Sequence, residues 1–351
     1  MAGRRPAFRH VAKDRQVTEH ISRDDLADLL TKIFLRHRCT ETTARMLAEN
    51  MATAEGDGAL SHGIFRITGN LASLDSGWVD GMAVPTVEDV APGMVRADGN
   101  NGFALPAFAA ARELFVTKAR SNGIAVMSVR NSHHFGALWP DIEPFAREGF
   151  IALMMVNSMA NVVPHGGRHR LYGTNPLGFA VPRDGRDPLV FDQASSAWSN
   201  GDVQIARREG RQLPEGVGVD SDGNPTTDPN AVLEGGAILP FGGHKGSSVA
   251  MMMEVMAAGL AGGDFSFEVD WSAYPGAATP RTGQTIILID PRRGAPRNFA
   301  ARMDVLIDAI HEAGQDRLPG DRRYANRRRS DKEGIPLRRE DLARLRELAT
   351  G

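Results

Sequence analysis

The chain has 351 residues, of which 42% are hydrophobic and 24% are charged, and its formal net charge is -2. This composition is typical of a globular protein and is long enough for two or three structural units. The charge balance gives no general reason to expect a nucleic acid or a membrane as a partner. Cys39 is the single cysteine, which excludes an internal disulfide and favours a reducing, cytoplasmic location.

The N-terminal third predicts a tail followed by helices. Residues 1–20 are basic and lack an apolar run, so we expect a flexible tail and no targeting segment. Ser22 is a candidate N-cap for a helix that continues to about His37, and Thr40 is a candidate N-cap for the next one. The alanine-rich stretch 105–119 predicts a third helix.

From Gly123 onward the sequence predicts a mixture of strands and helices. Short runs rich in β-branched and apolar residues occupy 123–129, 151–157, 188–192 and 285–290. A methionine-rich helix is expected over 247–260, with its methionine face packed in the core. The Asp222-Gly223 pair predicts a hairpin within 216–229, and helices return at 300–313 and 338–348.

This order of elements predicts an α/β fold in which a central domain with a mixed sheet is inserted between helical ends of the chain. We expect residues 21–120 and 300–351 to pack together as one helical domain for substrate binding and dimerisation, and residues 121–299 to form the α/β domain. Neither G-x-G-x-x-G nor a P-loop pattern is present, which disfavours a Rossmann dinucleotide domain.

The stretch 57–66, DGALSHGIFR, combines a proton-transfer group with a cation. If the segment is helical, His62 and Arg66 lie one turn apart on the same face. A histidine titrates near neutrality, and an arginine pairs with a carboxylate through two hydrogen bonds. This pattern indicates a site for a small carboxylic acid.

Four further stretches carry polar residues at points where strands or helices are expected to begin or end. In 131–140, NSHHFGALWP, the adjacent His133 and His134 diverge and lack further ligands at metal-site spacing, so we expect no metal. The other three stretches are the turn before Pro176 in 173–183, the run 191–203 that ends near Asp202, and the glycine-rich 240–248. On its own Asp202 is explained equally well as a helix cap. The basic run 322–329 is interpreted as solvated surface.

Taken in chain order, these motifs resemble the malate/L-lactate dehydrogenase type II family over about Ser22 to Tyr324. The runs HHFGALWPDIEPFA, LPFGGHKGS and RLPGDRRY are similar to the branch that reduces Δ1-piperideine-2-carboxylate and Δ1-pyrroline-2-carboxylate. The resemblance implies a non-Rossmann NAD(P)-binding domain, a homodimer and NADPH as cofactor, with NADH as a weaker substitute.

The resemblance also implies a role for each matching position. Ser61, His62 and Asp202 match a proton relay, and Arg66 matches the arginine that binds the substrate carboxylate. Further substrate contacts are implied for Thr174, Asn200 and Gly201. The implied cofactor-binding residues are His134, Phe135, Gly136, Ala137, Leu138, Asp192, Gln193, Ala194, His244, Lys245, Arg317, Gly320, Arg322 and Arg323. The chain departs from the branch at Gln193, Trp198 and Asn200, which puts the identity of the substrate in question.

The reaction that these residues suit is reduction of a C=N or C=O bond next to a carboxylate. It needs a hydride at carbon, a proton at the heteroatom and a cation for the acid group. These groups serve either reaction, and it is the resemblance to the branch that favours a cyclic imino acid, reduced to L-pipecolate or L-proline, over a 2-keto acid of the lactate or malate type. A non-catalytic ligand-binding or metal-binding protein is a third hypothesis, which the presence of Ser61, His62, Arg66 and Asp202 opposes.

Overall fold

The computed structural model of the chain describes residues 18–294 and 298–350. Most of the predicted tail, residues 1–17, lies outside the described residues. The prediction is wrong for residues 18–20, because strand β1 (Thr18–Ile21) pairs antiparallel with β12 (Ile335–Arg338) near the other end of the chain. A partner more than 300 residues away leaves no local signal in the sequence.

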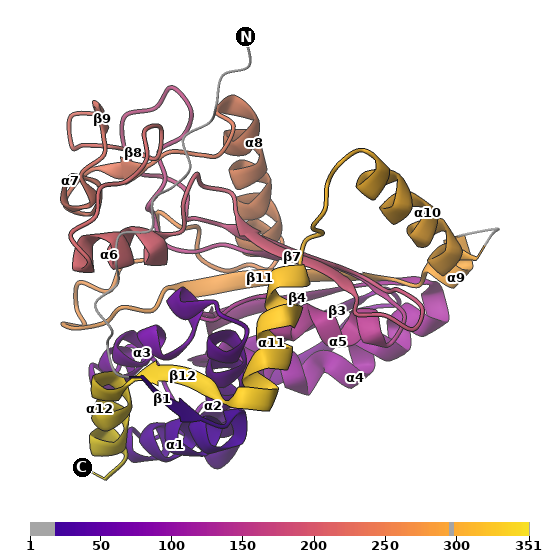
Figure 1. Cartoon of the computed structure of the whole chain (residues 1–351), viewed down its shortest axis with the longest axis horizontal. Helices are drawn as coiled ribbons and strands as arrows, with labels where there is room; N and C mark the ends of the chain where they lie inside the picture. The colour runs from indigo at the N-terminus through magenta and orange to yellow at the C-terminus, as the bar shows by residue number, and fades with distance from the viewer. Residues whose placement is uncertain (1–17, 295–297, 351) are drawn as a thin grey trace.

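The two ends of the chain form one helical layer. Helices α1 (Arg23–Arg36) and α2 (Glu41–Gly56) begin at the predicted caps, where the hydroxyls of Ser22 and Thr40 accept hydrogen bonds from backbone N–H groups of their first turns at 3.0 and 3.1 Å. Helix α12 (Arg339–Thr350) packs on α1, and leucines from both fill a shared core (Figure 1). The predicted packing of the N-terminal helices against the C-terminal segment is present in this layer.

A seven-stranded mixed sheet forms the centre of the molecule. Its strands, in spatial order, are β2 (Thr86–Ala91), β3 (Met94–Phe103), β4 (Ile124–His133), β11 (Arg281–Ile289), β5 (Ile151–Val156), β6 (Pro176–Val181) and β7 (Leu189–Ala194). β3 and β4 pair parallel across helix α4 (Ala104–Asn122), and the other neighbours pair antiparallel. Since β2, β3 and α4 belong to this layer, the domain boundary expected at residue 120 falls inside it.

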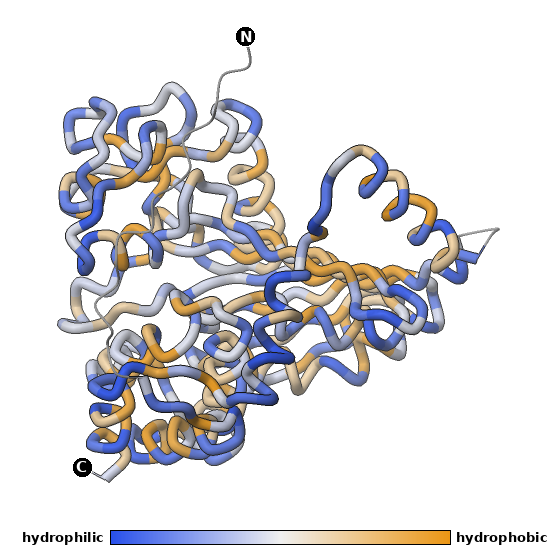
Figure 2. Tube along the Cα trace, in the orientation of Figure 1, coloured by the Kyte–Doolittle hydropathy of each residue, from blue (hydrophilic) through white to orange (hydrophobic). Residues whose placement is uncertain are grey.

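Helices cover both faces of the sheet. Helices α4 and α5 (Trp139–Arg147) pack on one face, where the core is fully buried and includes Phe115, Phe145 and Met154. On the other face lies α8 (His244–Met253), which continues into the π-helical segment η3 (Glu254–Gly259). Figure 2 shows hydrophobic residues concentrated along the central strands between these layers.

A smaller lobe stands at one end of the sheet. It consists of α6 (Asn200–Arg208), α7 (Pro229–Leu233) and a three-stranded sheet of β8 (Gly218–Val219), β9 (Pro225–Thr226) and β10 (Ala237–Ile238). The predicted hairpin is the β8–β9 pair, and Gly223 adopts the positive φ of 86° that its turn requires.

The methionine-rich helix is only partly buried, which corrects the prediction that its methionine face packs in the core. Met253 is fully buried, but Met251 and Met252 are 52% and 44% exposed and Val255 is 56% exposed. The face of α8 and η3 that points away from the sheet therefore carries apolar side chains that no part of residues 18–294 or 298–350 covers. None of the helices in the described residues is long and apolar enough to cross a membrane.

After β11 and the short α9 (Pro291–Gly294), the chain forms α10 (Phe299–Glu312) and α11 (Asp321–Glu333). Helix α10 projects from the body of the molecule, with Val305 and Leu306 more than half exposed (Figure 1). Helix α11 contains the basic run 322–329, and the prediction that this run is solvated surface is wrong for Arg327. That side chain forms ion pairs with two carboxylates from distant segments.

Candidate active site

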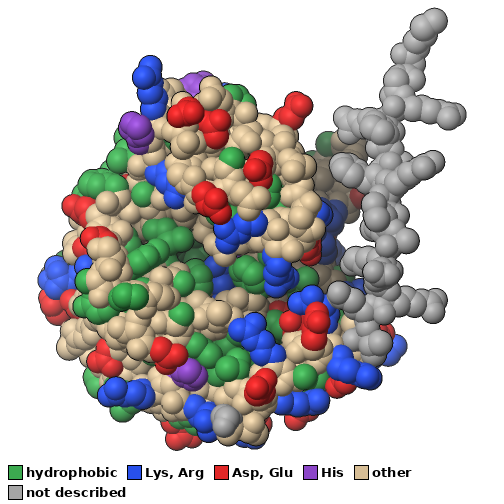
Figure 3. Space-filling model, turned by 90° about the vertical axis from the view of Figure 1, so that its left-hand side faces the viewer, with side chains coloured by type: hydrophobic (Ala, Val, Ile, Leu, Met, Phe, Trp, Pro, Cys, Tyr) green, Lys and Arg blue, Asp and Glu red, His purple; other side chains and the backbone are tan. Residues whose placement is uncertain are grey.

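The residues that the sequence singled out converge on a pocket of about 760 Å³ between the helical layer, the sheet and the small lobe. Figure 3 looks onto the side where α3 (Ile67–Asp75) and α6 lie in Figure 1, and shows a hollow between the two halves of that face. The pocket wall comes mainly from residues 57–62, 134–136, 156–159 and 192–202. These segments are far apart in sequence and meet at the ends of strands and helices.

The stretch 57–66 forms two 3₁₀ turns, η1 (Leu60–His62) and η2 (Ile64–Arg66), that lead into α3. Gly63 separates the turns, and a Cβ at this position would lie 1.9 Å from a carboxylate oxygen of Glu55. That carboxylate accepts the backbone N–H of Ile64 at 2.9 Å. Glycine is therefore required for the turn to approach α2, and the approach directs His62 and Arg66 into one pocket.

His62 has the surroundings of a proton-transfer group. Its Nδ1 lies 3.1 Å from the hydroxyl oxygen of Ser61, and its ring meets Trp139 edge-on at 6.4 Å between centroids. Burial lowers the pKa of His62 to about 3, and the positive charge of Arg66 adds to this effect, as does His134. The imidazole is therefore neutral at pH 7 in the free protein.

Arg66 is a buried cation to which no carboxylate of the described residues is bound. Its guanidinium lies over the ring of Phe135, 4.1 Å from the centroid, and its buried Nε has no hydrogen-bond partner among the described residues. Burial lowers the pKa of Arg66 to about 10, opposed by the negative charge of Asp202. A buried donor in this condition is unfavourable unless a ligand satisfies it, and a carboxylate matches its geometry.

Helix α6 brings the third member of the predicted relay to the same place. The Ser199 hydroxyl caps the helix by accepting the Asp202 N–H at 3.0 Å, and Gly201 packs so closely that a Cβ there would lie 3.2 Å from Cβ of Ser61. Asp202 itself is exposed, and its carboxylate forms no hydrogen bond to Ser61 or His62 among the described residues. Asn200, Gly201 and Asp202 all line the pocket, as does Thr174.

The turn that carries Thr174 is fixed from behind by a buried carboxylate. Asn175 adopts a positive φ of 35°, and its amide nitrogen donates to Glu254 at 2.7 Å, where η3 begins. The Thr174 carbonyl accepts the backbone N–H of Ser195 at 2.9 Å. This network holds the Thr174 backbone at the pocket wall.

Many of the predicted cofactor residues also line the pocket: His134, Phe135, Gly136, Asp192, Gln193, Ala194, Arg322 and Arg323. Burial raises the pKa of Asp192, although its carboxylate accepts the Leu138 N–H at 2.7 Å. Ala137 and Leu138 are buried outside the pocket lining. The departures at Gln193, Trp198 and Asn200 all face the pocket, where they can affect specificity.

The remaining predicted cofactor residues lie apart from the pocket lining. His244 and Lys245 are exposed at the start of α8, Arg317 is exposed before α11, and Gly320 approaches the Val190 carbonyl. Their role stays a prediction.

Sequence reasoning missed several residues that line the same pocket: Asp57, Trp139, Asn157, Ser158, Asn161 and Arg211. Asp57 and Trp139 belong to two of the stretches that the sequence singled out, so their position was the available signal. The other four follow strand or helix ends without a recognisable pattern.

Comparison with known proteins places the chain in a family. Residues 21–346 match the family model described as malate/L-lactate dehydrogenase. The chain belongs to this family. Its curated relatives include proteins named Δ1-pyrroline-2-carboxylate/Δ1-piperideine-2-carboxylate reductase, of which two are described below.

The first relative, from Pseudomonas syringae pv. tomato, is 60% identical over 95% of this chain and 97% of its own length. The second, from Pseudomonas putida, is 58% identical over 92% of this chain and 95% of its own length. The crystal structure of Δ1-piperideine-2-carboxylate reductase from Pseudomonas syringae superposes with a TM-score of 0.93 at 60% identity, and the match covers 94% of this chain and all of that one. The mixed α/β fold with its central sheet is thus shared with solved members of the family.

Proposed function

We propose that the chain is an NADPH-dependent reductase of cyclic imino acids, which converts Δ1-piperideine-2-carboxylate to L-pipecolate and Δ1-pyrroline-2-carboxylate to L-proline. The observation that carries the proposal is that a buried arginine, whose Nε has no partner in the described part of the chain, shares one pocket with a neutral histidine. The names of relatives that are 58–60% identical over nearly the whole chain support the substrate class.

The polar and charged groups that line the pocket fit a nicotinamide dinucleotide. Arg322 and Arg323 line the pocket and supply cations for phosphates. When bound, NADPH would supply a hydride to the imine carbon. The proposal includes a non-Rossmann mode of binding, which the largely antiparallel order of the sheet supports, because Rossmann sheets are parallel.

The side chains of the pocket would bind and protonate the imine. Arg66, held flat against Phe135, would take the substrate carboxylate with two parallel hydrogen bonds and so fix the C=N bond beside His62. His62 would give its proton to the ring nitrogen as the C=N bond becomes CH–NH. The imidazole would then recover a proton from solvent by way of the Ser61 hydroxyl, 3.1 Å from Nδ1, and Asp202 at the mouth of the pocket would link this relay to solvent.

Substrate binding changes the proton affinity of His62 in the direction that the reaction needs. The pKa near 3 in the free protein has Arg66 as its second cause after burial. A carboxylate paired with Arg66 cancels that repulsion, so the pKa of His62 rises in the complex. Since the protonated form is the donor, kcat should fall as the pH rises through this raised pKa.

The preference for NADPH rests on the two arginines that line the pocket. A guanidinium can pair with the 2′-phosphate that distinguishes NADPH from NADH. We expect a higher kcat/KM with NADPH, and Arg322→Gln should narrow the difference. A higher kcat/KM with NADH in the wild type would overturn this part of the proposal.

The decisive experiment for the substrate follows NADPH oxidation with four compounds side by side. We expect both imines to be accepted, because a one-methylene difference is worth only about 1–3 kcal/mol in an apolar pocket. We expect lower kcat/KM for pyruvate and oxaloacetate. If the two keto acids are reduced with higher kcat/KM than either imine, the chain is a 2-hydroxyacid dehydrogenase instead.

We also propose that the protein is a cytoplasmic homodimer. Exposed apolar side chains, which the described part of the chain leaves uncovered, support the assembly: Met251, Met252, Val255, Val305 and Leu306. The single cysteine supports the location, and burial raises the pKa of Cys39 to about 12, which makes the thiol unreactive. Light scattering should give twice the chain mass, and a fully active monomer at assay concentration would contradict the dimer.

A further inference from the structure

Helix α11 docks onto the segment that precedes the catalytic turn. The Ser330 hydroxyl donates to the Gly56 carbonyl at 2.8 Å, and the Asn326 amide donates to the Asp57 carbonyl at 3.0 Å. Gly58, at a positive φ of 79°, lets Asn326 approach, since a Cβ there would lie 2.3 Å from its amide nitrogen. Helix α11 therefore contacts the chain only a few residues before Ser61 and His62.

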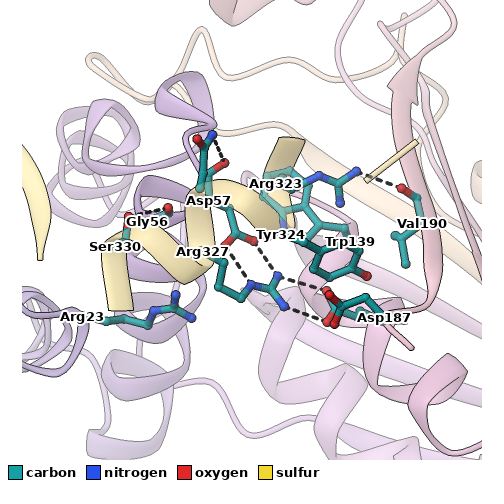
Figure 4. Close-up of polar contacts among 12 residues, drawn as sticks. Arg23, Gly56, Asp57, Trp139, Asp187, Val190, Arg323, Tyr324, Arg327 and Ser330 are labelled. Atoms are coloured by element: carbon teal, nitrogen blue, oxygen red, sulfur yellow. Dashed lines mark hydrogen bonds and ion pairs between the residues drawn. The ribbon is translucent and has the colours of Figure 1, made fainter. Parts of the chain in front are cut away.

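Asp57 is the centre of this contact. Its side chain is fully buried, and Arg327 binds it through two hydrogen bonds, from Nε at 2.9 Å and from Nη2 at 2.6 Å (Figure 4). The same guanidinium binds Glu143 of α5 at 2.7 Å. Burial alone would raise the pKa of Glu143, but its ion pairs with arginines, chiefly Arg327, lower that pKa. The two carboxylates in turn raise the pKa of Arg327.

The second oxygen of Asp57 also binds the candidate active site. The indole N–H of Trp139 donates to Oδ2 of Asp57 at 2.9 Å. Trp139 is almost fully buried, lines the pocket and presents its ring to the edge of His62, 6.4 Å between centroids. On the same ring lies the guanidinium of Arg323, 4.5 Å from the centroid. One indole thus contacts the proton-transfer histidine and a predicted cofactor residue.

These contacts form one continuous path from α11 through Asp57 and Trp139 to His62. We propose that Asp57, held by Arg327, is a positioning residue that fixes the Trp139 ring against His62. In this way Asp57 sets the geometry of the proton-transfer site and the exclusion of water from it. The proposal rests on the proposed function, because it assigns a role in the same pocket.

A purely structural ion pair would not need this arrangement. A buried ion pair is often no more stabilising than apolar residues of the same shape. Apolar residues would not accept an indole N–H, and a buried N–H without an acceptor is unfavourable. The Asp57 carboxylate has three donors, two from the helix and one from the pocket wall, so the position of the wall depends on the position of the helix.

The consequence for His62 is electrostatic. Burial is the largest cause of its lowered pKa, and the Trp139 ring is part of the wall that buries it. The charged groups that face His62 from other elements are Arg66 and His134, with Asp202 on α6. Trp139→Phe replaces none of these groups, nor Arg323 on the other side of the indole, so it alters the hydration of the imidazole and keeps those side chains.

The test uses three variants of the full chain. Trp139→Phe keeps an aromatic ring but replaces the indole by the smaller phenyl ring, so it removes the N–H together with part of the wall beside His62. Asp57→Asn keeps the shape and removes the charge. Arg328→Gln is the matched control, because Arg328 is the next residue on α11, is exposed and pairs with Asp187. We expect kcat for the imine to fall about tenfold in the first two variants, with KM nearly unchanged because Arg66 still binds the carboxylate. The control should match the wild type.

A second readout keeps the proposal separate from the identity of the substrate. His62 is titrated by NMR in the free protein, with its signal assigned by loss in His62→Ala. Wild-type His62 should stay neutral down to about pH 5, whereas in Trp139→Phe its pKa should move up toward the ordinary value of 6.5. If the wild type reduces no imine, this titration still decides the role of the path.

The proposal fails if Trp139→Phe and Asp57→Asn retain wild-type kcat and wild-type His62 titration. It also fails if both variants lose thermal stability and activity together while the pKa of His62 in Trp139→Phe stays where it is in the wild type. That result would mean that the contact only stabilises the fold. Trp139→Phe leaves the Arg327 ion pairs intact, so it remains informative if Asp57→Asn does not fold.

Discussion

Arg66 in the catalytic turn and Arg327 in helix α11 are both arginines in the interior, and their surroundings differ in one respect. Arg327 is surrounded by carboxylate oxygens of Asp57 and Glu143. Arg66 lies against Phe135 with an Nε that has no partner among the described residues. All three nitrogens of the Arg327 guanidinium donate hydrogen bonds to carboxylates, and we call this arginine saturated. Arg66 is unsaturated, because it has N–H donors left for a ligand.

The difference shows how to distinguish two uses of the same side chain. A saturated arginine fixes the parts of the chain that bind it, which here are α2, α5 and α11. An unsaturated one destabilises the free protein slightly and is retained for what it binds. Removing each of them should therefore have opposite effects on the free energy of unfolding.

The largest effect on activity is expected when Arg66 is kept and the neighbouring His62 is removed. His62→Ala should lower kcat by about 10²–10⁴-fold, the usual loss for a general acid, with NADPH affinity nearly unchanged. Steady-state kinetics and a cofactor titration measure the two quantities. Near wild-type turnover would show that His62 is not the donor.

Arg66→Met removes the unsaturated guanidinium and keeps most of its volume. We expect kcat/KM for the imine to fall about 10²–10³-fold, because a bidentate charge-assisted pair with the carboxylate is lost. The free energy of unfolding should stay equal or rise, since a buried charge without a counterion is gone. Kinetics and urea denaturation test the pair, and a large loss of stability would mean that Arg66 supports the fold.

Arg327→Met should instead lower the free energy of unfolding. It leaves Asp57 and Glu143 buried without their cation, and such a loss costs about 3–5 kcal/mol. Arg328→Gln, on the exposed side of the same helix, should change the unfolding free energy by less than about 0.5 kcal/mol. Equal effects of the two substitutions, measured by urea denaturation, would contradict the contrast between a buried and an exposed pair.

The smallest effect is expected in the pH dependence of stability. In the unfolded chain His62 takes up a proton near pH 6.5, whereas in the native state it does so only near pH 3, so the protein loses stability as the pH falls through this range. His133, whose pKa is also lowered to about 3, acts in the same direction. Arg66→Met raises the native pKa of His62, so the loss between pH 7 and pH 5 should be smaller than in the wild type. An unchanged loss would mean that Arg66 does not act on His62.

The sequence predicts the local parts of this account and not the contacts between them. Caps at Ser22 and Thr40 and the apolar strands are local patterns, and so are the motifs that contain His62, Arg66 and Thr174. Trp139 and Arg327 reach Asp57 across 82 and 270 residues, and the basic run that contains Arg327 is indistinguishable from a solvated surface by composition. The exposed methionines of α8 were missed because a periodic apolar face has the same pattern whether it packs inside the chain or against another one.

The most direct test of the central claim, that the unsaturated arginine is the one that binds substrate, is a calorimetric titration with pyrrole-2-carboxylate in the presence of NADP⁺. This planar acid resembles the imine and cannot be reduced under these conditions. The account predicts binding to the wild type and to Arg328→Gln with the same affinity, and a loss of at least about tenfold in Arg66→Met. Equal affinity in Arg66→Met and the wild type would contradict it.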